Sequence, residues 1–146
     1  MELKYAAPGE GMTYYVLGGD IVTIKADTRD TEGAYVVLET EVPSQGGPPP
    51  HVHHCEEESY YVLEGEFEFH VGEQTETARP GAFLIAPRNV PHHFRNIGMN
   101  PGRLLVIVKP AGFERFIEEV ARLPRDGAVD PGLLQEIAHR YGVEFV

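Results

Sequence analysis

The chain has 146 residues, 42% of them apolar and 24% charged, which is the composition of an ordinary folded protein and enough length for one hydrophobic core. Its 12 basic and 23 acidic side chains give a formal net charge of −11, and this negative field repels nucleic acid and anionic membrane surfaces. No apolar run approaches the roughly 20 residues that cross a bilayer, so we expect a single domain over residues 1–146 with no nucleic acid and no membrane among its partners.

Most of the chain has the pattern of short strands. Between about residues 12 and 110, apolar or alternating segments are separated by Gly, Pro, Asn and Asp about every eight to twelve residues, which is typical of an all-β sandwich or barrel. The predicted strands are 14–18, 21–26, 34–42, 50–54, 59–65, 66–72, 82–87, 92–98 and 103–110. The segments 82–86 and 104–108 are apolar on both faces, which predicts that a second sheet, an arm or a partner subunit covers their second side.

Near the carboxyl end the apolar residues recur at helical spacing. A first amphipathic helix is predicted by Phe113, Phe116, Ile117, Val120 and Ala121. A second helix is predicted to begin with Asp130 as N-cap and Pro131 at its first position, and to stop at Gly142. We therefore expect a barrel over about residues 12–110 and a helical cap over about residues 112–142 of the same domain.

Five of the seven histidines fall in two short clusters. Residues two apart on a strand project to the same face, so His51 and His53 are predicted to point together while His54 points away. Glu58 lies five positions beyond His53, and this odd offset requires a turn between them. We expect residues 54–57 to form that turn and to place Glu58 on the antiparallel neighbouring strand, facing the imidazoles across the ladder.

The second histidine cluster supplies a further candidate ligand. His92 would bring it from a distant strand to His51, His53 and Glu58. Three neutral imidazoles and one carboxylate suit a borderline first-row ion, and they leave positions open for water or substrate. The residues therefore predict one divalent transition-metal ion, which could be Fe, Mn, Ni, Co or Zn because the same ligands serve all of these.

Two stretches of the sequence resemble the two motifs of the cupin family. GGPPPHVHHCEEESYYVLEG is similar to the first motif, and GAFLIAPRNVPHHFRN is similar to the second. The matching residues are His51, His53, Glu58 and Gly65 in the first stretch and Gly81, Pro87, His92 and Asn96 in the second. Glu57 is a rival ligand, but only Glu58 leaves six residues before Gly65.

The sequence departs from these motifs at two places. The opening glycine is displaced, with Gln45 in its place and Gly46 following, and Asn89 replaces an internal glycine. Asparagine tolerates the left-handed conformation better than other non-glycine residues, so we expect the turn at Asn89 to persist. The resemblance implies a double-stranded β-helix, the jelly-roll cupin barrel, with a metal ion on His51, His53, Glu58 and His92.

Several neighbouring residues have more than one interpretation. His54 and His93 face away by parity and are expected at the surface or behind the ligands. Asn96 is expected to be a structural hydrogen-bonding residue. The aromatic residues Tyr60, Phe67, Phe69, Phe83 and Phe94 are expected in the core, with lining of an apolar pocket as the alternative. Cys55 is the only cysteine, so no intramolecular disulfide forms, and together with the lack of an apolar secretory signal this predicts a cytoplasmic protein.

The resemblance extends to quercetinase-like cupins, through HVHHCEEESYYVLEGEFEF and the terminal RYGVEF. It implies a metal-dependent dioxygenase acting on a small apolar or aromatic enol-type substrate, with Glu58 as the catalytic base for the substrate hydroxyl proton. One alternative is a non-catalytic small-molecule binding or sensing module. Another is a sugar isomerase or epimerase, which would need inward-facing Arg or Lys for phosphate. A homodimer is expected because one short chain has little material to cover its doubly apolar strands.

Overall fold

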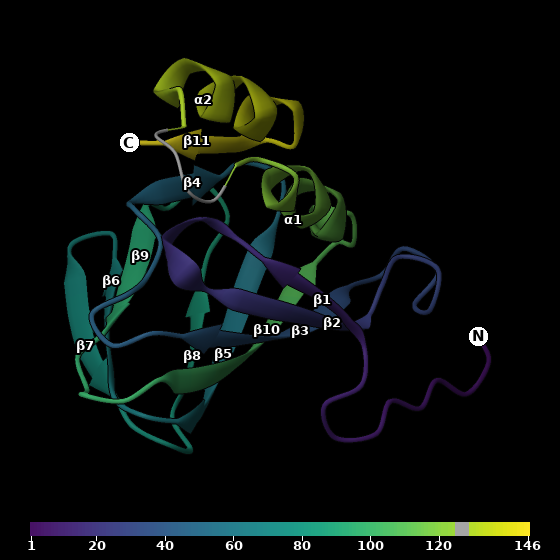
Figure 1. The fold of residues 1–146 in the computed structure, drawn as a ribbon, viewed down its shortest axis with the longest axis horizontal. Coiled ribbons are helices and arrows are strands. Elements are labelled where there is room, and N and C mark those ends of the chain that lie inside the picture. Colours follow the sequence, from purple (N-terminus) through teal and green to yellow (C-terminus); the bar gives the residue numbers. More distant parts are fainter. Residues whose placement is uncertain (125–128) are drawn as a thin grey trace.

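The computed structural model describes residues 1–124 and 129–146, and Figure 1 shows their arrangement. The strands are β1 (Met12–Tyr15), β2 (Ile21–Ala26), β3 (Val36–Val42), β4 (His51–His53), β5 (Glu57–Glu64), β6 (Phe67–Val71), β7 (Gln74–Ala78), β8 (Phe83–Ala86), β9 (His92–Asn96), β10 (Gly102–Lys109) and β11 (Val143–Phe145). The helices are the 3-10 turn η1 (Leu17–Gly19), α1 (Phe113–Ala121) and α2 (Pro131–Arg140).

The strands form two antiparallel sheets that enclose a common core (Figure 1). The six-stranded sheet has the order β1-β2-β3-β10-β5-β8, and the five-stranded sheet has the order β11-β4-β9-β6-β7. Leu38 and Val106 from the first sheet pack in one buried cluster with Phe67 and Phe69 from the second. This arrangement confirms the predicted all-β jelly roll, a double-stranded β-helix.

The central strands show why the sequence folds in this way. Strands β3 and β10 are neighbours, and in both the buried side chains alternate with more exposed ones. Their fully buried apolar residues are Val36, Val42, Leu104 and Val108. On the outer side of the same sheet, Phe83, Ile85 and Ile107 are 59%, 46% and 37% exposed, so the rest of the described chain leaves this apolar face uncovered.

Two strands of the structure were not predicted. Strand β7 is polar and exposed except at Ala78, because it is an edge strand and β6 is its one neighbour among the described strands. Its one sequence signal is the two-residue connection after Val71, which begins with Gly72 at a φ of 60°. Strand β11 has three residues and pairs with β4.

The first predicted strand, 14–18, was placed too far along the chain, because β1 begins at Met12. Strand β1 ends at Tyr15, and the chain then forms η1. Gly18 and Gly19 have φ values of 86° and 90°, which extended strand geometry does not allow. The two glycines therefore make a tight connection from β1 to β2.

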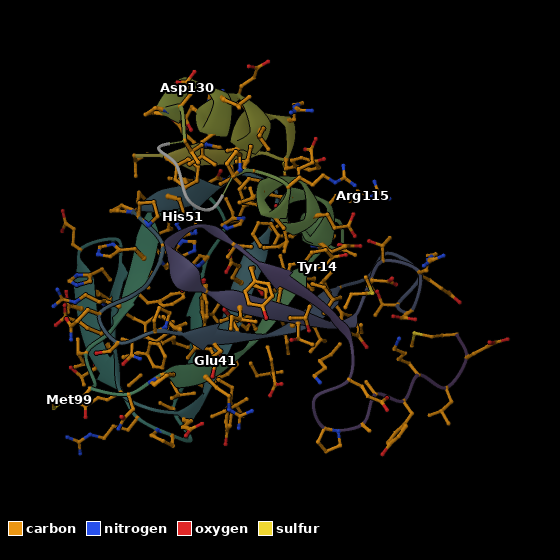
Figure 2. The ribbon with its side chains drawn as sticks, viewed as in Figure 1. Tyr14, Glu41, His51, Met99, Arg115 and Asp130 are labelled. Carbon is orange, nitrogen blue, oxygen red and sulfur yellow. The ribbon has the colours of Figure 1, made fainter. Side chains whose placement is uncertain are left out.

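Both predicted helices are confirmed, with residues 125–128 between them lying outside the described residues. Asp130 caps α2 by accepting a hydrogen bond from the Gly132 amide at 2.9 Å, and it lies at the end of the helix in Figure 2. A second apolar cluster joins the two helices to β11 through Phe116, Val120, Ile137, Ala138 and Val143. Among the described residues no helix is long and apolar enough to cross a membrane. The single-domain organisation and the cytoplasmic location stay predictions.

One buried carboxylate attaches α1 to the barrel. Glu114 accepts hydrogen bonds from the Thr28 amide at 2.9 Å, from the Thr28 hydroxyl, and from the Gly112 amide at 3.0 Å. Burial raises the pKa of Glu114, but these hydrogen bonds outweigh it and hold the pKa below its usual value of 4.5. The ionised form therefore stabilises the folded protein.

We expect Glu114→Ala to lower the free energy of unfolding at pH 7 by about 1–3 kcal/mol, because it leaves the partly buried Thr28 and Gly112 amides without their acceptor. Since the folded pKa is below the unfolded one, this stabilisation is present above pH 4.5 and is lost as the pH falls further. Urea unfolding at pH 7 and at successively lower pH measures the difference. The matched control is Glu136→Ala on the exposed face of α2. If the difference in the free energy of unfolding between the wild type and Glu114→Ala stayed constant with pH, the stabilising role of ionised Glu114 would be contradicted.

Candidate metal centre

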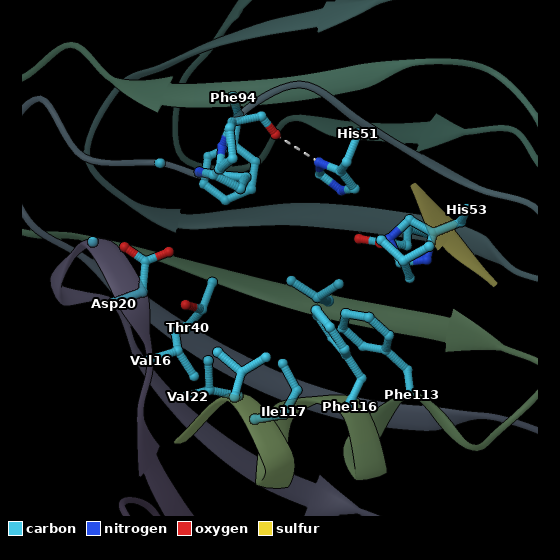
Figure 3. A pocket seen from close by; sticks show the side chains of 18 of the residues that line it. Val16, Asp20, Val22, Thr40, His51, His53, Phe94, Phe113, Phe116 and Ile117 are labelled. Carbon is cyan, nitrogen blue, oxygen red and sulfur yellow. Dashed lines mark hydrogen bonds and ion pairs between the residues drawn. The ribbon is translucent and has the colours of Figure 1, made fainter. Parts of the chain in front are cut away.

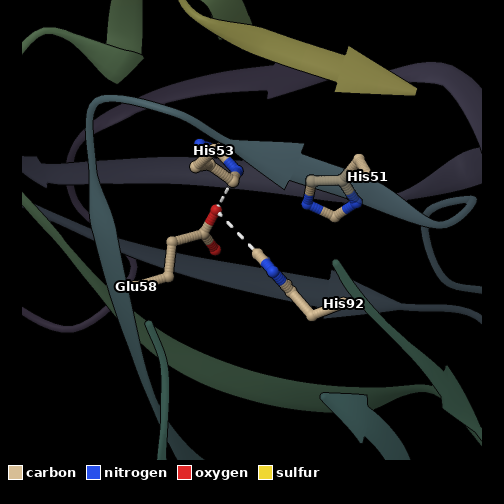
Figure 4. Close-up of side chains that lie close together, drawn as sticks. All are labelled: His51, His53, Glu58 and His92. Atoms are coloured by element: carbon tan, nitrogen blue, oxygen red, sulfur yellow. Dashed lines mark ion pairs between the residues drawn. The ribbon is translucent and has the colours of Figure 1, made fainter. Parts of the chain in front are cut away.

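Four side chains from three strands converge inside the barrel (Figure 4). His51 and His53 lie on β4, and His92 lies on β9 directly opposite His51 in the strand register. Glu58 lies on β5 of the other sheet. One ligand atom from each residue lies within 4.8 Å of the others, and all four residues are buried.

The prediction that Glu58 lies on a strand paired with the strand of His51 and His53 was wrong. Strand β4 pairs with β9 and β11, whereas β5 pairs with β10 and β8, so Glu58 is not on a hydrogen-bonded neighbour of β4. The segment after His53 crosses from one sheet to the other, and Glu58 reaches the imidazoles across the interior of the sandwich. Because the site joins the two sheets, an ion held there would link them.

Backbone carbonyls orient two of the imidazoles. His51 Nδ1 lies 2.9 Å from the Pro49 carbonyl oxygen (Figure 3), and His92 Nδ1 lies 3.0 Å from the Val90 carbonyl oxygen. A carbonyl oxygen can only accept, so each Nδ1 carries the proton and each Nε2 presents a lone pair. His53 Nδ1 lies 3.5 Å from Glu56 Oε1. The two carbonyls are the kind of outer partner that metal-binding histidines use. His53 Nδ1 has this ion contact but makes no hydrogen bond among the described residues.

The converging atoms fit a cation. Within residues 1–124 and 129–146, His53 Nε2, His92 Nε2 and Glu58 Oε1 are buried and make no hydrogen bond of good geometry. They lie close all the same, since Glu58 Oε1 forms an ion contact with His53 Nε2 and is 3.8 Å from His92 Nε2. Buried acceptor atoms without donors are unfavourable, and a divalent ion would satisfy them together.

The charges at the cluster favour the ligand forms of His51 and Glu58 but not that of His53. Burial lowers the pKa of His51 to about 4, so this imidazole is neutral at neutral pH. Burial alone would raise the pKa of Glu58, but His53 and the other histidines hold it well below its usual range. Burial opposes protonation of His53, but the Glu58 and Glu56 carboxylates outweigh it and raise the pKa of His53 to about 10. A proton on His53 therefore competes with a metal ion for the same nitrogen.

The turns at the two unusual motif positions keep the left-handed backbone. Asn89 has a φ of 66°, as expected, and its amide donates to the His53 carbonyl at 2.8 Å. Gln45 also has a φ of 66°, and its amide donates to the Asn96 carbonyl at 2.8 Å. The backbone therefore adopts the geometry that glycine would favour even though the side chains differ.

The flanking residues take the structural roles expected of them. His54 is exposed and hydrogen-bonds Asn89 and Glu144, and His93 stacks on His70 with ring centroids 4.4 Å apart. Asn96 is fully buried, and its side chain makes three hydrogen bonds to backbone groups. Glu57 faces away from Glu58 along β5, and the exposed Cys55 is not among the converging ligands.

An apolar cavity of about 300 Å³ opens beside His51, His53 and Glu58 (Figure 3). Its wall includes Tyr60 and Phe94, whereas Phe67 and Phe69 belong to the core and Phe83 is exposed. The sequence did not predict that Phe113, Phe116 and Phe145 from the carboxyl end also line it, nor that Asp20 does. No lysine or arginine lines this cavity among the described residues.

Tyr60 connects the cavity wall to the metal-binding cluster. Its hydroxyl group donates a hydrogen bond to Glu58 Oε2, and burial next to the Glu58 charge raises the pKa of Tyr60 well above its usual value. Tyr60 therefore stays protonated and holds one oxygen of the Glu58 carboxylate. The other oxygen, Oε1, is the one that faces His53 and His92.

A comparison with protein families matches residues 37–108 to the cupin domain, and all four ligands lie within the match. The chain is a small cupin. This cupin is 28% identical over 123 residues to a quercetin 2,3-dioxygenase of Bacillus subtilis (strain 168), which covers 84% of the cupin and 36% of the relative. It thus spans about a third of the length of that relative.

Solved structures share the fold of this cupin. The polyketide cyclase RemF from Streptomyces resistomycificus superimposes with a TM-score of 0.67 at 24% identity, covering 92% of each chain. An RmlC-like cupin from Shewanella frigidimarina gives a TM-score of 0.67 at 17% identity, covering 78% of this cupin and 96% of the other chain. At such identities these likenesses show the fold alone.

Proposed function

We propose that this cupin is a metal-dependent dioxygenase that acts on a small apolar or aromatic enol-type substrate. The observation that carries the proposal is the buried cluster of three histidines and one glutamate, of which His51, His53 and Glu58 line an apolar cavity. The similarity to a quercetin 2,3-dioxygenase supports it. His51, His53, Glu58 and His92 would hold the ion, which supplies Lewis acidity and, for Fe, Mn, Co or Ni, a redox-capable centre for dioxygen.

In this proposal Glu58 accepts the proton of the substrate hydroxyl group. Tyr60 holds Oε2, so Oε1 is the oxygen that takes the proton. A carboxylate beside cationic neighbours is a weak base, because their charge lowers its pKa. Glu58 therefore has to move away from the ligand cluster as the substrate arrives, and the apolar wall of the cavity excludes water during the transfer.

The cavity argues against the sugar-phosphate alternative. A phosphate needs cationic donors, and the described residues of the wall contain neither lysine nor arginine. A non-catalytic binding module would need only the cavity and the ion, so turnover has to decide between it and the dioxygenase.

Oxygen consumption by defined metal forms tests the proposal. The cupin is loaded separately with Fe, Mn, Ni, Co and Zn, and each form is assayed with flavonols, other enols and diketones. We expect at least one redox-capable form to consume dioxygen with an enol substrate while the zinc form is slow or inert, because zinc has no redox chemistry. Tight binding of apolar ligands with no turnover by any form would instead favour the binding module.

We also propose that the cupin forms a homodimer through the outer face of its six-stranded sheet. Tyr61 and Phe83 are direct neighbours in the strand register, and Ile85 and Ile107 both lie beside Ser59. All four apolar side chains are more than a third exposed, so they form a continuous apolar patch. In a dimer with a two-fold axis this patch packs against the same patch of the second copy. Two apolar surfaces can pack in this way without unpaired charges.

Sedimentation at micromolar concentration is expected to show a dimer for the wild-type protein and a monomer for Ile85→Glu, because two introduced carboxylates would be buried at the interface. The control is Leu133→Glu, which adds the same charge at an exposed apolar residue of α2, and it should remain dimeric. A monomeric wild-type protein would contradict the proposal.

A further inference from the structure

Asp20 places a carboxyl group in the cavity wall, away from the metal-binding cluster. The residue is 9% exposed, and its Oδ1 is buried without a hydrogen-bond partner among the described residues. Figure 3 shows Asp20 on the far side of the cavity from His53. A buried carboxyl oxygen that no described residue pairs is unfavourable, so it is suited to a hydrogen-bonding partner from a bound ligand.

The local backbone fixes the position of this carboxyl group. Asp20 lies between η1 and β2, at the end of the tight connection that Gly18 and Gly19 allow. The Asp20 carbonyl accepts a hydrogen bond from the Val16 amide at 3.0 Å, which closes the connection. Ile21 then begins β2 and pairs with Tyr15. The side chain is thus presented by a defined hairpin loop.

Within the part of the chain that the structure describes, no ion pair is formed by Asp20. The titratable groups that share the cavity wall are His51, His53, Glu58 and Tyr60. The Tyr60 hydroxyl group already donates its hydrogen bond to Glu58. Burial raises the pKa of Asp20 to about 7, so its protonated and ionised forms coexist near neutral pH. A ligand hydroxyl group suits both forms, because it can donate to a carboxylate and accept from a carboxylic acid.

We propose that Asp20 determines specificity by hydrogen-bonding a hydroxyl group at the end of the substrate opposite the reacting enol. The substrate class is then an elongated, flat enol with an apolar body and a second hydroxyl group at its far end. The inference rests on the proposed function for the enol end, and on Asp20 for the far end. A cavity of about 300 Å³ is at the small end of the usual range and suits a body of two or three rings.

A pair of probes that differ in one hydroxyl group tests the role of Asp20. The probes are 3-hydroxyflavone and 3,4′-dihydroxyflavone, whose extra hydroxyl group lies at the far end from the enol. Binding to the metal-loaded protein is measured by titration, and kcat/KM is measured by oxygen consumption. We expect the wild-type protein to prefer the dihydroxy probe by about 10- to 100-fold, the range for one buried polar hydrogen bond.

Asp20→Ala should lose this preference and bind 3-hydroxyflavone as the wild-type protein does, whereas Asp20→Asn should keep part of it, since an amide still donates and accepts. Both variants should retain their metal. Asp20→Asn should also unfold at a higher temperature than the wild type, because a neutral amide is easier to bury than an unpaired carboxyl group.

The outcomes separate this inference from the proposed function. Loss of the preference in Asp20→Ala without turnover by any metal form would support Asp20 and contradict the dioxygenase. Turnover with equal preference in the wild type and Asp20→Ala would overturn the role of Asp20 and leave the dioxygenase standing. Loss of stability in both variants would also overturn it, because Asp20 would then have a structural partner.

Discussion

Replacing His92 with alanine should remove most of the metal from the cupin. His92 Nε2 is one of the buried acceptor atoms that face the cluster, and its ring is fixed through Nδ1 by the Val90 carbonyl. Loss of an outer partner weakens metal binding about 10- to 100-fold, so loss of the ligand itself should weaken it by more than about 100-fold. His51→Ala should behave in the same way.

Elemental analysis of the protein purified without added metal measures this effect. The matched control is His54→Ala, which removes an adjacent imidazole that is exposed and points to Asn89 and Glu144 instead of the cluster. It should retain the wild-type metal content. Equal metal content in His51→Ala, His92→Ala and His54→Ala would refute the assignment of the ligands.

Glu58→Gln should keep part of the metal but lose nearly all turnover. The single glutamine oxygen can take over only one of the two roles of the Glu58 oxygens, either accepting the hydrogen bond from Tyr60 or ligating the ion, and an amide does not accept the substrate proton. General base catalysis contributes about 100- to 10,000-fold, so a loss of at least about 100-fold in kcat is expected.

Steady-state oxygen consumption, corrected for the metal content of each preparation, measures the loss. The control is Glu57→Gln, one residue away on β5 but on the opposite face of the strand, and it should be as active as the wild type. Wild-type activity in Glu58→Gln would exclude Glu58 as the base.

The spacing of histidines on one strand was sufficient to predict half of the metal-binding cluster. His51 and His53 share a face of β4 because side chains alternate along any strand. The approach of Glu58 could not be derived in this way, since it depends on which strands pair across the whole chain. Parity along the sequence is a local property, whereas the crossing from one sheet to the other is set by the topology.

The cavity was less predictable than the ligands. The helix containing Phe113 and Phe116 was recognised from its period, but nothing in that period says that these side chains reach the metal-binding cluster. Asp20 gave no signal at all, because a single aspartate after two glycines is the ordinary composition of a surface loop. Its burial follows from packing between elements that are far apart in the sequence.

The pairing of β11 with β4 couples the carboxyl end of the described chain to the metal ligands. Val143 lies opposite His53, and Phe145 lies opposite His51 while also lining the cavity. Strand β4, which carries His51 and His53, is only three residues long, so its ordered conformation depends largely on pairing with β11. Transient detachment of β11 would leave this edge of β4 unpaired and would open the cavity wall at the same time. Access of solvent to the interior and retention of the ion are therefore governed by the same local unfolding equilibrium.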